Sequence, residues 1–270
     1  GDFFNSDYSN QNPYFGRMSS SQTAMVDEDI SAVNATLFSV FLGLDDFMPF
    51  IKSGTRSDSL PDLNTFENNY RQILETLTSN GAKGVISTIP DITSAPYFTT
   101  VGWNDLLLDS TNNSTLNSIY NPLEFYFTEG YNPFMIEDPA ANAFGVRPIE
   151  EGELILLSVP LDSVKCYKMG TIFPFRNEFI LTNPELQDIR THLGLINNII
   201  RSLALEFNLG LVEAEEFFNN INSGFPFNGI NMGTAFISGG AYGLDGIRFN
   251  ARTNALFANE FIKSINQKYN

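Results

Sequence analysis

The chain alternates between continuous apolar runs and stretches with a helical apolar repeat. The runs lie at residues 36–42 (TLFSVFL), 83–89 (KGVISTI) and 209–212 (LGLV). Short runs of apolar and β-branched residues are typical of strands that are buried on both faces of a parallel sheet. The pattern therefore predicts three parallel strands.

Helices are predicted at residues 66–77, 183–203 and 250–265, where apolar residues recur at three- and four-residue steps. Thr182 and Glu185 have the spacing of a capping box at the start of the second helix. Strands that alternate with helices favour an α/β fold in which helix layers cover a parallel sheet.

Residues 109–176 break this rhythm. Strand-like pieces at 123–128, 153–159 and 164–169 lie there among prolines, glycines and asparagines. The stretch is interpreted as a mixed β insertion in a single domain over 1–270. We expect it to lie over the strand ends, where α/β proteins bind ligands.

Composition narrows the function classes. A formal charge of -16 repels phosphate backbones, which excludes nucleic acid as a main partner. No apolar stretch approaches the ~20 residues that a membrane span requires. One cysteine, Cys166, excludes an internal disulfide and a cysteine-rich metal site, and its apolar surroundings predict a buried side chain.

Four segments together resemble a branch of the SGNH/GDSL ester-hydrolase superfamily that is found among bacterial surface lipoproteins. They are residues 12–15 (NPYF), 38–46 (FSVFLGLDD), 80–100 and 236–262. The resemblance implies a three-layer, flavodoxin-like sandwich with a parallel sheet. It also implies an exported protein, periplasmic or at the cell surface, whose removed N-terminus is compatible with a lipid anchor.

Enzymes of this superfamily combine a serine nucleophile, glycine and asparagine donors to the oxyanion, and a C-terminal Asp-x-x-His. The hydroxyl is inert until a neutral imidazole takes its proton, and the oxyanion requires donors. Gly43 and Asp46 match the donor block, but Asp45 stands in place of the asparagine. Asp245 matches the last block, whereas Arg248 stands in place of the histidine base.

The nucleophile block is missing from the chain. In the family it precedes the segment that residues 12–15 resemble, and Phe3 stands where a serine would be required. The single histidine, His192, falls within a predicted helix and does not align with the base. The resemblance thus implies a catalytically impaired binding or structural module. The alternative is an active carboxylic-ester hydrolase whose serine lies upstream of Gly1.

The departures from the family suggest an inherited ligand cleft at Gly43, Asp45, Asp46, Asp91 and Arg248. We expect Asp45 and Arg248 to form a bidentate ion pair across it. In the alternative interpretation, Arg248 pairs with Asp245 or faces solvent. A small ester or a glycan would suit such a cleft, and the chain predicts no cofactor.

The same resemblance makes residues 36–42 the third strand of the family, so that the first strands are absent. The segment would then be an exposed apolar edge, which folded proteins avoid. We expect residues 1–17, a second copy in a homodimer, or a separate N-terminal fragment to cover it.

Acidic clusters raise the question of a metal site, but none has the spacing of a calcium-binding EF-hand, so no metal is predicted. A glycosidase with paired carboxylates has no supporting motif. Four aromatic residues of the insertion are candidates either for stacking on sugar rings or for core packing. They are Trp103, Tyr126, Tyr131 and Phe134.

Overall fold

The computed structural model describes residues 4, 14–21, 23–57 and 59–270. Its central feature is a parallel sheet of three strands in the order β1-β2-β9. The strands are β1 (Leu37–Val40), β2 (Lys83–Ser87) and β9 (Gly210–Val212). Each lies within one of the three predicted runs, so the parallel strands are confirmed. Leu37 pairs with Lys83, and Val85 pairs with Gly210.

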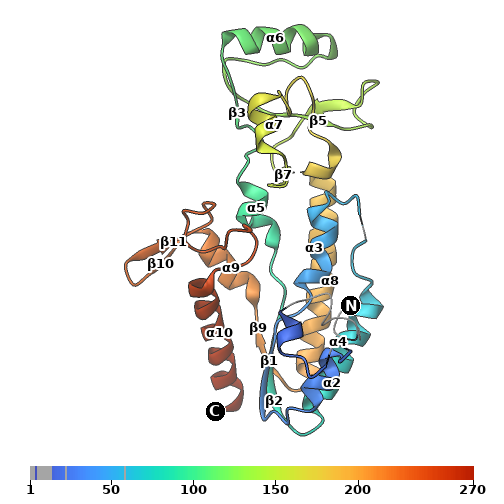
Figure 1. Cartoon of the computed structure of the whole chain (residues 1–270), viewed down its shortest axis with the longest axis vertical. Coiled ribbons are helices and arrows are strands. Elements are labelled where there is room, and N and C mark those ends of the chain that lie inside the picture. Colours follow the sequence, from blue (N-terminus) through green and yellow to red (C-terminus); the bar gives the residue numbers. More distant parts are fainter. Residues whose placement is uncertain (1–3, 5–13, 22, 58) are drawn as a thin grey trace.

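Helices lie on both sides of this sheet (Figure 1). α4 (Leu63–Thr78) and α8 (Asn183–Glu206) pack together on one side. α10 (Ala251–Tyr269) lies on the other side with α9 (Ala214–Asn222). The three helices predicted from periodicity are therefore confirmed, and Glu185 closes the expected capping box with Thr182. The fold is mixed α/β with a parallel three-stranded sheet.

Shorter elements connect these layers. α3 follows β1 directly, and α5 leads from β2 toward the second part of the molecule. A hairpin, β10-β11, follows α9. The elements are η2 (Phe15–Arg17), α2 (Val26–Ser31), α3 (Leu44–Lys52), η3 (Ile92–Ser94), α5 (Pro96–Thr99), β10 (Phe225–Phe227) and β11 (Ile230–Met232).

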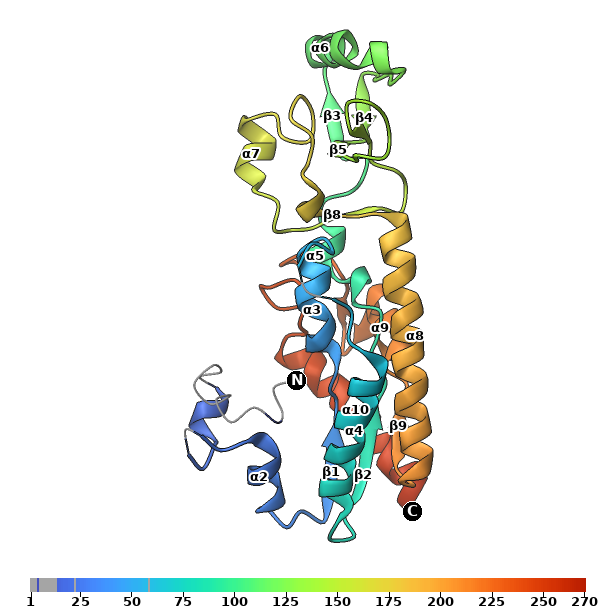
Figure 2. The same cartoon turned by 90° about the vertical axis from the view of Figure 1, so that its right-hand side faces the viewer.

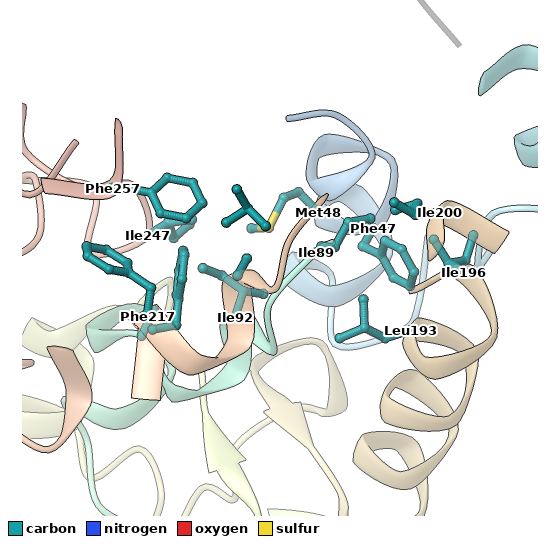
Figure 3. Packing of buried hydrophobic residues seen from close by; sticks show 14 of the residues in the cluster. Phe47, Met48, Ile89, Ile92, Leu193, Ile196, Ile200, Phe217, Ile247 and Phe257 are labelled. Carbon is teal, nitrogen blue, oxygen red and sulfur yellow. The ribbon is translucent and has the colours of Figure 1, made fainter. Parts of the chain in front are cut away.

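The main hydrophobic core fills the space between the sheet and its helices. Figure 3 shows Phe47 of α3 packed near Leu193 and Ile196 of α8, while Phe217 and Phe257 meet on the other side. The Phe217 and Phe257 rings are 5.1 Å apart between centroids. This packing fixes α3 and the loop before it at the end of β1.

A second lobe with its own core stands at one end of the molecule (Figures 1 and 2). It contains three pairs of short antiparallel strands, β3-β4, β5-β6 and β7-β8. Its elements are β3 (Leu106–Leu108), α6 (Ser110–Tyr120), η4 (Asn121–Leu123), β4 (Gly130–Asn132), β5 (Met135–Glu137), β6 (Val146–Pro148), β7 (Leu154–Ile155), α7 (Leu161–Cys166), η5 (Asn177–Phe179) and β8 (Ile180–Leu181).

The sequence predictions for short elements and side-chain burial in this lobe are only partly confirmed. Of the three strand-like pieces, only residues 153–159 contain a strand, whereas 164–169 begin within helix α7 and 123–128 form no strand. The prediction that Cys166 is buried is wrong, because its side chain is exposed. Apolar runs of this length do not distinguish a strand from a short helix. Among the described residues, no helix is long and apolar enough to cross a membrane.

A buried ion pair joins β6 to the segments before and after it in the second lobe. The Arg147 guanidinium donates from Nη1 and Nη2 to the two Glu153 carboxylate oxygens, each at 2.7 Å. Its Nε donates to Asp138 at 2.6 Å, and this bond holds the pKa of the Asp138 carboxyl below its ordinary value. The Glu153 side chain is only 1% exposed. Its charge therefore depends on Arg147 for compensation.

We predict that Arg147→Met destabilises the fold by about 3 kcal/mol, because it leaves a buried carboxylate without its cation. Urea unfolding measures this change. The same substitution in an exposed ion pair, Arg176→Met, serves as the control and should change stability by less than about 0.5 kcal/mol. If the two substitutions changed the free energy of unfolding equally, the buried pair would contribute no more to stability than an exposed one.

Candidate functional site

A cavity of about 760 Å³ lies beside the edge strand β1. Its walls come from the loop after β1, from α4, from α9 and α10, and from the N-terminal segment that contains Phe4 and Tyr14. Most of the lining is apolar. The apolar wall includes Phe15, Met18, Val26, Phe41, Leu42, Phe66, Ile73, Ile92, Phe218, Ile247, Phe249 and Phe257.

The cavity lies in the direction in which the sheet would continue beyond β1. Phe66 of α4 borders it from one side of the sheet and Phe257 of α10 borders it from the other. Figure 2 shows α2 and the segment before it standing apart from β1, on the side away from β2 and β9. The predicted cover by residues 1–17 falls mostly outside the described residues. Of the described ones, Phe4, Tyr14 and Phe15 line the cavity.

Gly43 forms the turn from β1 into α3. Its φ of 105° is a conformation that residues with a side chain rarely adopt. A Cβ atom at this position would lie 2.6 Å from Ile89 Cδ1 and 2.9 Å from the Phe66 ring. The glycine therefore allows the chain to leave β1 close to α4, and it places Asp45 and Asp46 at the cavity wall.

Arg248 reaches both of the carboxylates that the sequence associates with it. Its Nη2 donates to Asp45 Oδ1 at 2.8 Å, and its Nη1 lies 3.5 Å from Asp245 Oδ2. The predicted Asp45–Arg248 pair therefore forms, but the expected bidentate geometry is wrong, because a single hydrogen bond joins them. The alternative pairing with Asp245 also forms. The side chains of Arg248 and Asp45 are 66% and 80% exposed, so water screens the pair.

Asp245 organises the loop that carries Arg248. Its Oδ1 accepts hydrogen bonds from the Ile247 and Arg248 N–H groups, both at 3.0 Å. The Tyr97 N–H donates to the Gly246 carbonyl at 2.9 Å, which ties this loop to α5. The loop is thus held in position while the Arg248 side chain projects to the cavity mouth.

Asp91 is not part of this cavity. Its carboxylate accepts hydrogen bonds from Arg190 Nε at 2.8 Å and from the Thr93 N–H at 2.9 Å. Its own N–H donates to Glu215 at 2.7 Å. These bonds fix the loop after β2, a structural role. The structure brings together Gly43, Asp45, Asp46 and Arg248, and it leaves Asp91 apart.

The described residues that line the cavity include no serine, cysteine or histidine. The Thr65 hydroxyl donates to Asp62 at 2.7 Å within the cap of α4. His192 lies on α8, where its Nε2 is 2.6 Å from the Pro61 carbonyl oxygen, and it does not line the cavity. Phe3 lies outside the described residues. The described lining therefore offers no hydroxyl or thiol beside an imidazole.

Two cavity residues escaped the sequence analysis. Hydrogen bonds from the Thr65 N–H and hydroxyl hold the pKa of the Asp62 carboxyl below its ordinary value. Tyr70 follows the apolar repeat of α4 and gave no separate signal. Its side chain is 2% exposed, and burial raises the pKa of its hydroxyl. Within the described structure this hydroxyl has no hydrogen-bond partner.

The aromatic residues of the second lobe have divided roles. Phe134 is buried in the second core and Trp103 packs partly against it. Tyr126 and Tyr131 are exposed. Core packing therefore accounts for Trp103 and Phe134, whereas the rings of Tyr126 and Tyr131 are exposed to solvent.

Comparison of the sequence with protein-family models gave no match, and a search among curated proteins gave no significant match. The structure agrees with the SGNH/GDSL resemblance at the level of a mixed α/β fold with a parallel three-stranded sheet and small antiparallel sheets. Family membership stays a prediction.

We predict that Tyr70→Phe stabilises the free protein by about 1 kcal/mol, because it removes a buried polar group that lacks a partner. Thermal and urea unfolding measure the change. Tyr242→Phe is the control, since the Tyr242 hydroxyl donates to Asn222 at 3.1 Å. That variant should lose stability. A loss of stability in Tyr70→Phe would show that its hydroxyl is bonded.

Proposed function

We propose that this chain is a non-catalytic binding module with an SGNH/GDSL hydrolase-like, three-layer fold. Its binding site is the cavity beside β1, and its ligand is apolar. The observation that carries the proposal is the Asp45–Arg248 hydrogen bond at the mouth of this largely apolar cavity. In a related hydrolase, the positions of Asp45 and Arg248 would hold an oxyanion donor and the base.

The chemistry of this pair is unsuited to ester hydrolysis. A guanidinium stays protonated above pH 12 and accepts no proton from a nucleophile. An ionised Asp45 accepts hydrogen bonds but has none to donate to a developing oxyanion. Loss of one triad member costs ~10⁴-fold in rate, so several losses abolish ordinary catalysis.

The cavity is suited to binding. Its volume of about 760 Å³ falls within the range of about 300–1,000 Å³ that is typical of small-molecule sites. Apolar walls favour the acyl part of a small ester over a glycan, because sugars require many hydrogen-bond partners. Tyr70, whose buried hydroxyl has no partner among the described residues, lines the same cavity. A buried hydroxyl without a partner lowers the stability of the free protein. A role of the cavity in binding would explain why the chain retains this hydroxyl.

The proposal includes an exported protein at the periplasm or cell surface. Its support is the resemblance to lipoproteins and a composition rich in asparagine, serine, threonine and phenylalanine. The formal charge of -16 supports a site for neutral or cationic molecules over anionic ones.

The protein is expected to give no turnover of a chromogenic acetyl ester and no labelling by a serine-directed phosphonate. The double variant Asp45→Asn, Arg248→His should stay inactive as well, because the nucleophile is still missing. Turnover or labelling of the unmodified protein would instead establish the alternative, an active carboxylic-ester hydrolase.

Binding is tested in parallel with the neutral apolar dye Nile red. Asn69 of α4 lines the cavity and Asn68 is exposed beside it. We expect Asn69→Trp to fill the cavity and to weaken dye binding at least about tenfold, whereas Asn68→Trp has no effect. Equal dye affinity in both variants would place the binding elsewhere.

A further inference from the structure

Among the described residues, no strand pairs with β1 on the side away from β2, and this side is called the open edge of β1. The Lys83 N–H donates to the Thr36 carbonyl oxygen at 3.0 Å, which fixes the phase of the β1-β2 ladder. Because alternate residues of a parallel strand face opposite neighbours, the peptide groups of Leu37, Ser39 and Phe41 point to the open edge. No described residue forms a hydrogen bond with these peptide groups.

On either side of the exposed Ser39, two apolar side chains of this edge are incompletely covered. Leu37 is 48% exposed and Phe41 is 37% exposed. α10 packs mainly over β9 and β2, and it reaches this edge through the contact of the Phe257 and Phe41 rings at 5.2 Å. Sheets usually protect an edge with a charged residue, a proline or a bulge. Residues 36–42 contain neither a charged residue nor a proline.

The cavity lies where another strand would fit. Neighbouring strands lie about 4.8 Å apart, in the plane of the sheet. Phe66 and Phe257, from the helices on opposite sides of the sheet, both line the cavity, and Phe41 and Leu42 form its floor at the strand end. A fourth strand beside β1 would place one row of its side chains against each of these helices.

Charge at the strand end selects the kind of partner. Among the described residues that line the cavity, the carboxylates of Asp45 and Asp62 outnumber the guanidinium of Arg248. The whole chain carries a formal charge of -16. This field disfavours an anionic amphiphile and a second copy of the same acidic chain, and it favours a segment with a lysine or arginine.

We infer that the open edge of β1 and the adjoining cavity bind an extended apolar polypeptide segment with a basic residue, which joins the sheet as a fourth strand. Main-chain hydrogen bonds to the peptide groups of Leu37, Ser39 and Phe41 supply affinity. Apolar side chains of the segment enter the cavity, and its basic residue lies near Asp45. The inference rests on the proposed function of the cavity as a binding site.

The test uses a labelled peptide of about eight residues, with valine at alternate positions and a lysine at each end, so that either strand direction is sampled. A matched peptide has glutamate in place of lysine, and a third is N-methylated at alternate peptide groups. We expect the glutamate and N-methylated peptides to bind at least about tenfold more weakly in fluorescence anisotropy.

Hydrogen exchange measured by NMR locates the contact. The lysine peptide should slow exchange of the Leu37, Ser39 and Phe41 amides at least about tenfold. The Phe38 and Val40 amides, which face β2, are internal controls. Peptide binding without this protection would overturn the inference, because the peptide would then occupy the apolar cavity without joining the sheet.

Variants of Ser39 test the edge from the side of the protein. Ser39→Pro removes one outward N–H and leaves the ladder to β2 intact, since proline is tolerated at such edge positions. It should weaken peptide binding at least about tenfold, whereas Ser39→Ala should not. If Ser39→Pro fails to fold, the N-methylated peptide tests the same hydrogen bonds from the opposite strand.

The outcomes separate this inference from the proposed function. If the lysine peptide fails to bind while Nile red binding remains sensitive to Asn69→Trp, the strand inference falls and the cavity remains a binding site. If neither the peptide nor the dye binds, both fall. Concentration-dependent dimerisation that protects the amide of Ser39 without peptide would assign the edge to a second copy and overturn the inference.

Discussion

The end of the sheet at β1 is the constraint from which the rest of the site follows. Helices cover both sides of the sheet, yet within the described part of the chain the strand β1 at its edge pairs with a strand on one side only. An apolar strand in that position requires something beside it. Across from it stands the N-terminal segment with Tyr14 and Phe15, and the space between is the cavity. At the end of β1, the left-handed turn at Gly43 brings the backbone into close contact with the Phe66 ring.

The ion pair at the mouth acts through its chemistry more than through its strength. Arg248 and Asp45 are mostly exposed, and exposed pairs contribute little to stability. Under the proposed relation to hydrolases, Arg248 would stand in place of a base although a guanidinium accepts no proton, and Asp45 would stand in place of an oxyanion donor although a carboxylate donates no hydrogen bond. Asp245 keeps the conformation of the loop through its bonds to backbone N–H groups.

Sequence reasoning found the features that depend on long periodic patterns. The strand at 83–89 and the helix at 183–203 each bury a continuous or periodic apolar face, and such patterns are visible without coordinates. The proximity of Asp45 and Arg248 came from the order of segments in a family resemblance, since no local pattern links positions so far apart in the chain.

The failures share a physical origin. Residues 164–169 begin within a short helix, and an apolar run of this length is compatible with either structure. Asp91 follows a buried strand, but its carboxylate accepts a hydrogen bond from Arg190 of α8, and the residue does not line the cavity. Tyr70 fits the apolar repeat of α4, and no pattern reveals whether a buried hydroxyl has a partner. These properties depend on which side chains meet in three dimensions.

The open edge also bears on association between copies of this chain. An apolar strand without a charged residue, a proline or a covering strand is a template for edge-to-edge association. The formal charge of -16 opposes association between copies of the same chain, and this repulsion acts before the edges come into contact. The same field would attract the basic segment that we infer as a partner toward Asp45 and Asp62. One electrostatic property can therefore protect the edge from self-association while leaving it accessible to a partner of opposite charge.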